Sequence, residues 1–129
     1  MILVDSSVWI DYFNGASSRE ADLLNQWLGQ RILLTGDLIY AEVLQGFRSE
    51  RDFARAKSAL DRLDFELMVG REVAVAAART YRRLRGRGVT IRKTIDVLIG
   101  TFCLLRGHEL LHNDRDFAAL VEHCGLRVV

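Results

Sequence analysis

The sequence contains no proline, only two cysteines, and no apolar run long enough to span a bilayer. Without proline, glycine is the main residue that marks turns and helix ends. Two cysteines without regularly spaced histidines make no zinc motif, so Cys103 and Cys124 are predicted to be small buried side chains in a reducing compartment. No basic segment precedes an apolar one at the start, as it would in a signal peptide. These absences predict a cytoplasmic protein that is not membrane-bound.

An excess of one charge is also lacking, because 18 basic and 17 acidic residues leave a net charge of +1. At the level of the whole molecule, this balance gives no reason to expect binding to nucleic acid. Half of the residues are hydrophobic, which is atypical of a disordered chain, and 129 residues suffice for one domain with a substantial core. We therefore expect residues 1–129 to form a single domain.

Apolar segments of strand length alternate with segments of helical periodicity along the chain. Such alternation is typical of an α/β fold, and we expect a central, mostly parallel sheet of about five strands flanked by helices. The predicted strands are 2–5, 31–35, 65–68, 109–112 and 127–129, and the predicted helices are 7–13, 18–29, 37–47, 50–63, 71–85, 94–106 and 114–123.

The most informative feature is where the acidic residues lie within these elements. Asp5 follows the first apolar strand, and Asp114 follows the strand at 109–112, at the position where open α/β sheets build their sites. Glu42 and Asp96 lie in apolar helical segments, in which an unpaired acid is costly to bury. Each acid alone also has a structural interpretation, as a helix cap, a first-turn residue or, for Glu42, a surface acid.

Carboxylates gathered at one sheet edge repel each other, and a divalent cation neutralises such a cluster. Hard oxygen ligands suit magnesium or manganese, which can acidify a bound water and stabilise charge on a scissile phosphate. The pattern therefore favours metal-assisted hydrolysis of phosphodiester bonds.

Four motifs occur in fixed order along the chain: Ile2–Ile10 (ILVDSSVWI), Tyr40–Val43 (YAEV), Ile95–Gly100 (IDVLIG) and Asn113–Phe117 (NDRDF). They resemble those of PIN-domain ribonucleases, and more narrowly those of VapC toxins from VapBC toxin–antitoxin systems. Each motif is weak alone, but together they cover both ends and the middle of the chain. The resemblance implies a PIN-like domain with a parallel sheet, a metal-dependent endoribonuclease activity and a role as a toxin.

The resemblance also implies the residues of the site and its partners. The catalytic acids would be Asp5, Glu42, Asp96 and Asp114, and the metal ligands for Mg²⁺ or Mn²⁺ would be Asp5, Asp96, Asp114 and Asp116. The expected partners are an RNA substrate, a small VapB-like antitoxin that inserts an amphipathic segment, and a second copy of the chain in a homodimer.

Three further residues lie beside these acids in the sequence. Ser7 matches a small hydroxyl residue of the family and could hydrogen-bond Asp5 or a metal-bound water, or cap the first helix. Asn113 would support the site or contact substrate, or serve as a turn residue. His112 stands where the family often has Thr or Ser, and we favour a structural role at the strand end over one as a general base.

Two surfaces are candidate binding sites. One is a basic group near the third acid that could hold an RNA backbone, or could simply be a solvated helix end; its members are Arg82, Arg83, Arg85, Arg87, Arg92 and Lys93. The other is the helical pair within 38–63, which in the family accepts an antitoxin helix. We favour a place in the core for most of its apolar residues, which are Leu38, Ile39, Val43, Leu44, Phe47 and Phe53.

Three other functions remain open from the sequence. One is a catalytically inactive PIN-like binding module, against which the presence of all the acids argues. Another is an Asp-dependent phosphotransferase or receiver-like domain, but a phosphatase of that kind would have a second Asp at the position of Ser7. A DNA nuclease shares the acidic pattern, although the small chain lacks further elements for DNA binding.

Overall fold

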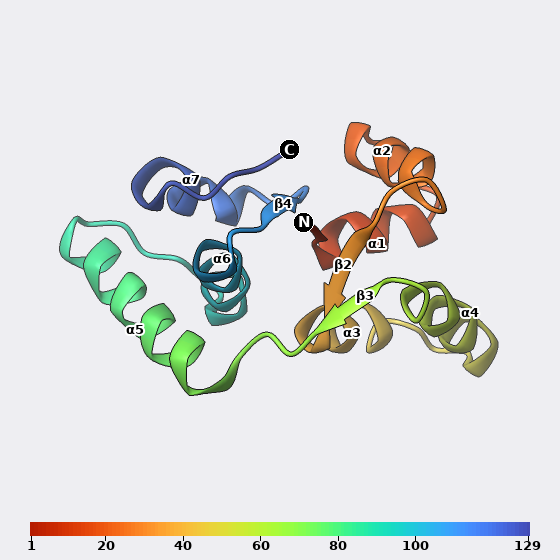
Figure 1. Cartoon of the computed structure of the whole chain (residues 1–129), viewed down its shortest axis with the longest axis horizontal. Coiled ribbons are helices and arrows are strands. Elements are labelled where there is room, and N and C mark those ends of the chain that lie inside the picture. The colour runs from red at the N-terminus through yellow and green to blue at the C-terminus, as the bar shows by residue number, and fades with distance from the viewer.

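A computed structural model describes all 129 residues of the chain. Four parallel strands form one sheet in the order β3-β2-β1-β4 (Figure 1). The strands are β1 (Ile2–Val4), β2 (Leu33–Gly36), β3 (Asp64–Glu66) and β4 (Glu109–Leu111). The α/β class and the parallel sheet expected from the sequence are confirmed.

Helices occupy most of the remaining chain, and Figure 1 shows α6 close to β4 with α5 on its outer side. They are α1 (Ser6–Phe13), α2 (Arg19–Trp27), α3 (Asp37–Leu44), α4 (Glu50–Leu60), α5 (Gly70–Gly86), α6 (Thr94–Arg106) and α7 (Ala118–Cys124), with a 3₁₀ turn at Arg115–Phe117. No helix has the length and apolar character needed to cross a membrane.

The prediction of a fifth strand at 127–129 is wrong. Val128 makes a single isolated parallel bridge to Leu110, supported by hydrogen bonds from Leu110 N to Arg127 O (3.0 Å) and from Val129 N to Leu110 O (3.1 Å). One bridge orders this segment beside β4 without making a strand. The strand predicted at 31–35 begins two residues later in the structure, at Leu33. Gln30 and Arg31 instead belong to the turn after α2, where both donate backbone hydrogen bonds to Trp27 O.

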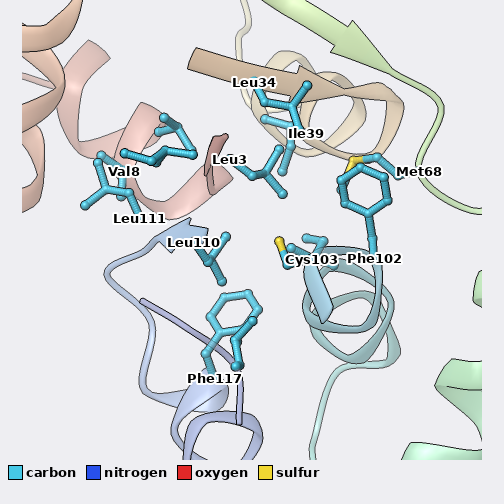
Figure 2. Close-up of a cluster of buried hydrophobic side chains, with 14 of the residues drawn as sticks. Leu3, Val8, Leu34, Ile39, Met68, Phe102, Cys103, Leu110, Leu111 and Phe117 are labelled. Carbon is cyan, nitrogen blue, oxygen red and sulfur yellow. The ribbon is translucent and has the colours of Figure 1, made fainter. Parts of the chain in front are cut away.

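The core lies on both faces of the sheet. Leu3 of β1 is fully buried and pairs in register with Leu34 of β2 and Leu110 of β4 (Figure 2). Neighbouring residues of a strand point to opposite faces, and Figure 2 places Leu111 near Val8 of α1 while Leu110 lies on the side of α6. Burial on both faces explains why these strands are continuous apolar runs instead of alternating patterns.

A close approach between β2 and β3 fixes the sheet next to the predicted site. Gly36 ends β2 with extended backbone, and a Cβ atom built there would lie 2.6 Å from Glu66 O and 2.5 Å from Met68 Cγ. A backbone oxygen cannot move aside as a side chain can. Glycine is therefore required at position 36 because a larger side chain would clash with β3 and Met68, and not because of its backbone conformation.

We expect Gly36→Ala to lower the free energy of unfolding by about 1–3 kcal/mol, the usual cost of overpacking. Gly86→Ala is the control, because a Cβ there meets nothing within 4 Å and alanine favours the helix. Chemical denaturation monitored by circular dichroism measures both. Equal stability of Gly36→Ala and the wild type would show that the backbone of β3 can shift away from the added methyl group at little cost.

Candidate active site

Parallel pairing brings two of the predicted acids to one edge of the sheet. Val4 is in register with Leu111, and Asp5 N donates a hydrogen bond of 2.9 Å to Leu111 O. Asp5 therefore lies at the carboxyl end of β1, next to the segment that follows β4 and carries Asp114. This placement follows directly from the strand order.

The start of α6 brings a third acid to the same edge. Asp96 lies in the first turn of α6 and is only 2% exposed. One carboxylate oxygen each of Asp96, Asp114 and Asp116 lie within 4.8 Å of one another. Three carboxylates at this spacing could hold a metal ion, and Asp96, Asp114 and Asp116 are here called the carboxylate cluster.

Asp5 adjoins this cluster and is held by a network of hydrogen bonds. Its Oδ2 accepts from Ser7 N at 3.0 Å and from Ser7 Oγ at 2.6 Å. Ser7 Oγ in turn accepts from Asn113 N at 3.0 Å, which connects α1 to the segment after β4. Asp5 is therefore the N-cap residue of α1, and Ser7 orients its carboxylate. The predicted hydrogen bond from Ser7 to Asp5 is confirmed, whereas the prediction that Ser7 caps the helix is wrong.

The side chain of Asn113 is engaged elsewhere. Its Nδ2 donates to Asp11 Oδ2 on α1 at 2.7 Å, so the amide is tied to the surface of that helix. The contribution of Asn113 to the site comes through its backbone N–H.

Glu42 of α3 lies near the cluster but is not one of its three members. Its Oε1 accepts from Ser6 Oγ at 2.9 Å, a partner that sequence reasoning missed because 36 residues separate the two. Burial raises the pKa of Glu42, and the negative charges of Asp5 and Asp114 raise it further. This arrangement leaves Oε2 free of any hydrogen bond within the protein.

Burial also governs the charges of the other acids. It raises the pKa of Asp5 despite the hydrogen bonds from Ser7. It raises the pKa of Asp96 to about 6, against the opposing effect of the Lys93 ammonium and with reinforcement from Asp114 and Asp5. Although burial acts in the same direction at Asp114, the ammonium of Lys93 and the N–H of Asp116 hold the pKa of that carboxyl below its usual value.

Two buried carboxylate oxygens show that these residues suit a divalent metal ion. Asp5 Oδ1 and Asp96 Oδ2 receive no hydrogen bond, although both are buried. Lys93 Nζ lies 3.3 Å from Asp96 Oδ2 as an ion pair without hydrogen-bond geometry. Buried carboxylate oxygens without donors are costly, and hard oxygen atoms are the ligands that Mg²⁺ and Mn²⁺ prefer. The donor set fits such an ion.

Of the predicted RNA-binding residues, two lie among the acids. Lys93 Nζ is 2.8 Å from Asp114 Oδ2, and Arg92 Nη2 is 3.3 Å from both carboxylate oxygens of Asp116.

The four arginines at 82–87 form no ion pair with the cluster. The helix predicted at 71–85 ends one residue later than expected, because α5 continues to Gly86. Arg83 Nη2 lies 3.2 Å from Cys124 Sγ, and the guanidinium of Arg85 lies 5.6 Å from the Tyr81 ring.

His112 is built into the turn after β4. Its Nδ1 accepts a hydrogen bond of 3.2 Å from Asp114 N, and its ring packs 4.9 Å from the Phe117 ring. Burial lowers the pKa of His112, although the Asp5 carboxylate opposes the shift. These contacts place the proton of the neutral ring on Nε2 and support a structural role over that of a general base.

Among known protein families, the model of the PIN domain family matches residues 2–122 of this chain. Ribonuclease VapC11 of Mycobacterium tuberculosis is 29% identical in an alignment that covers 98% of this chain and 96% of that protein.

Two solved structures illustrate the similarity in fold. DNA-bound VapBC from Salmonella typhimurium contains a chain with a TM-score of 0.77 and 16% identity, with coverage of 99% of this chain and 96% of that one. A toxin–antitoxin complex from Klebsiella pneumoniae contains another with a TM-score of 0.72 and 22% identity, covering 100% and 96%.

We expect Asp96→Asn to stabilise the protein in EDTA above pH 6. The pKa of Asp96 is raised in the folded state, so the folded protein holds this proton more tightly than the unfolded chain does. Ionisation as pH rises through about 4 to about 6 therefore lowers stability in the wild type. The melting temperature of Asp96→Asn should exceed that of the wild type at pH 8 by about 4 °C, which corresponds to roughly 1 kcal/mol.

Below pH 4 the difference between Asp96→Asn and the wild type should disappear, because both side chains are then neutral. Asp64→Asn, on the exposed edge strand, controls for the loss of one negative charge. A lower melting temperature for Asp96→Asn at pH 8 would mean that the pairing with Lys93 outweighs the cost of burial.

Proposed function

Because the chain belongs to the PIN domain family, we propose that it is a metal-dependent endoribonuclease that hydrolyses RNA phosphodiester bonds, with residues 1–129 forming one PIN domain. The observation that carries the proposal is the convergence of Asp96, Asp114 and Asp116 at the sheet edge, beside the buried and unpaired Asp5 Oδ1. Similarity to proteins named VapC ribonuclease supports the choice of RNA as substrate.

In this proposal the residues that hold a Mg²⁺ or Mn²⁺ ion are Asp5, Asp96, Asp114 and Asp116. When bound, the ion supplies Lewis-acid chemistry: it neutralises phosphate charge and lowers the pKa of a coordinated water. Ser7 keeps the Oδ2 atom of Asp5 occupied, so that Oδ1 is the oxygen left for the site.

Glu42 is the residue best suited to move a proton. Ser6 fixes its Oε1, and Oε2 is the atom available to accept a proton from the attacking water. Burial raises the pKa of Glu42 above the usual value of a glutamate, and a higher pKa makes the carboxylate a stronger base. This raised pKa distinguishes Glu42 from an ordinary surface acid.

We propose further that the chain is the toxin of a toxin–antitoxin pair, acting in the cytoplasm as a homodimer. The solved structures with the same fold come from such complexes. A groove of about 740 Å³ runs between α1 and α4, and its lining includes Phe13, Phe47 and Ala59. Its mixed aromatic and basic lining suits an amphipathic antitoxin segment.

This groove only partly matches the surface expected from the sequence. Ile39 and Val43 belong to the core, whereas Phe47 lies at the groove and packs 5.7 Å from Phe13. A basic side chain from the bound antitoxin could also reach the acids and neutralise their charge.

We expect purified, antitoxin-free protein to cut total RNA into discrete products with Mg²⁺ or Mn²⁺ and to be inactive with EDTA. Asp5→Asn, Asp96→Asn and Glu42→Gln should each reduce cleavage by a factor of about 100 or more while the circular dichroism spectrum is retained. Asp64→Asn is the matched control and should cleave normally. Normal cleavage by Asp96→Asn would exclude this assignment of the site, and inactivity of the folded wild type toward total RNA would favour a binding module.

We expect Ala59→Arg to prevent copurification of the antitoxin, because the long side chain would fill the groove between α1 and α4. Ala54→Arg, on the exposed face of the same helix, should retain the antitoxin. Both variants should cleave RNA like the wild type, since neither residue belongs to the site. Full antitoxin binding by Ala59→Arg would place the antitoxin on another surface.

A further inference from the structure

The ammonium of Lys93 lies among all three members of the carboxylate cluster. Its Nζ is 2.8 Å from Asp114 Oδ2, 3.3 Å from Asp96 Oδ2 and 3.8 Å from Asp116 Oδ2. These are the same three residues whose oxygens could hold a metal ion. One positive charge of the protein thus occupies the centre of a site suited to a divalent cation.

The position of Lys93 is costly without these acids. Lys93 is the N-cap residue of α6 and makes no side-chain capping hydrogen bond. A cation at a helix N-terminus is opposed by the helix dipole, and Ser, Thr, Asp or Asn would cap the helix better. The three carboxylates offset this cost, and the pKa of Lys93 is raised by Asp114 and Asp96 although burial opposes the shift.

A lysine at position 93 also suits a cation that can be released from the carboxylate cluster. Lys57 and Lys93 are the only lysines among 18 basic residues. Arginine would bind carboxylates through a rigid, two-pronged fork, whereas lysine presents a single point charge on a flexible stem. The side chain of Lys93 is 47% exposed, so it can swing toward solvent without leaving the edge of the site.

We propose that Lys93 is an internal counter-ion that holds the carboxylate cluster together without metal and competes with the divalent ion for it. This inference rests on the proposed function, because it assumes that the cluster is the metal site. Lys93 then sets the metal affinity: the ion binds only by displacing the ammonium. The displaced ammonium remains at the site edge, where it can pair with a phosphate of the substrate.

The first test is Mn²⁺ binding by isothermal titration calorimetry in the absence of RNA. Lys93→Gln should bind Mn²⁺ about tenfold more tightly than the wild type, a change equivalent to about 1.4 kcal/mol. Arg92→Gln is the matched control, because it removes the same charge from a side chain that is 80% exposed and contacts only Asp116. Its Mn²⁺ affinity should change much less.

The second test uses the wild-type chain and does not depend on the folding of a variant. Limited acetylation of lysines, read by mass spectrometry, should modify Lys93 several times faster with saturating Mn²⁺ than with EDTA. Lys57 is the internal control, because it is 54% exposed and pairs with Asp61 at 2.7 Å, away from the cluster. Its rate should be the same in both conditions.

The outcomes separate this inference from the proposed function. Equal Mn²⁺ affinity of the wild type and Lys93→Gln, or an unchanged rate of Lys93 acetylation, would overturn the role of Lys93 while leaving the metal site intact. Absence of Mn²⁺ binding by both proteins would instead overturn the metal site, and with it the metal-dependent activity. Tighter binding by Lys93→Gln together with faster acetylation of Lys93 in Mn²⁺ would support the proposal.

Discussion

Mutual repulsion among carboxylates at one sheet edge is the constraint on which the rest of the site depends. The parallel pairing of β1 with β4 forces Asp5 toward the segment carrying Asp114, and the start of α6 adds Asp96. Burial adds a second cost, because the loss of water raises the pKa of Asp5 and of Asp96. Strands buried on both faces supply the stability that allows the fold to carry this unfavourable group.

The sequence was sufficient to predict the parallel sheet and the acidic edge. Short apolar runs can be buried on both faces only in a sheet covered by helices, and the carboxyl ends of parallel strands meet at one edge. Asp5 follows such a run directly and Asp114 follows one within a few residues, so their position required no knowledge of distant contacts. Asp96 was recognisable because an acid in an apolar helix needs a partner.

What the sequence could not provide depends on contacts between distant segments. The bond from Ser6 to Glu42 joins α1 to α3, and the bond from Asn113 N to Ser7 joins residues 106 positions apart. The arginines at 82–87 were expected to hold RNA near Asp96, but Arg83 contacts Cys124 and Arg85 lies over the Tyr81 ring. The pairing of Lys93 with Asp96, by contrast, spans three residues at a helix start and was recognisable from spacing alone.

In the proposed site the same side chains, those of Asp5 and Asp114, serve both as helix caps and as metal ligands, with one oxygen for each. Asp5 caps α1 through Oδ2 and leaves Oδ1 unpaired, while Asp114 accepts from Asp116 N through Oδ1 and presents Oδ2 to Lys93. A cap fixes the rotation of the carboxyl group, so the second oxygen is aimed without further support. For Asp5 and Asp114 the structural interpretation therefore does not compete with the functional one, because the cap is what makes the free oxygen available in a defined direction.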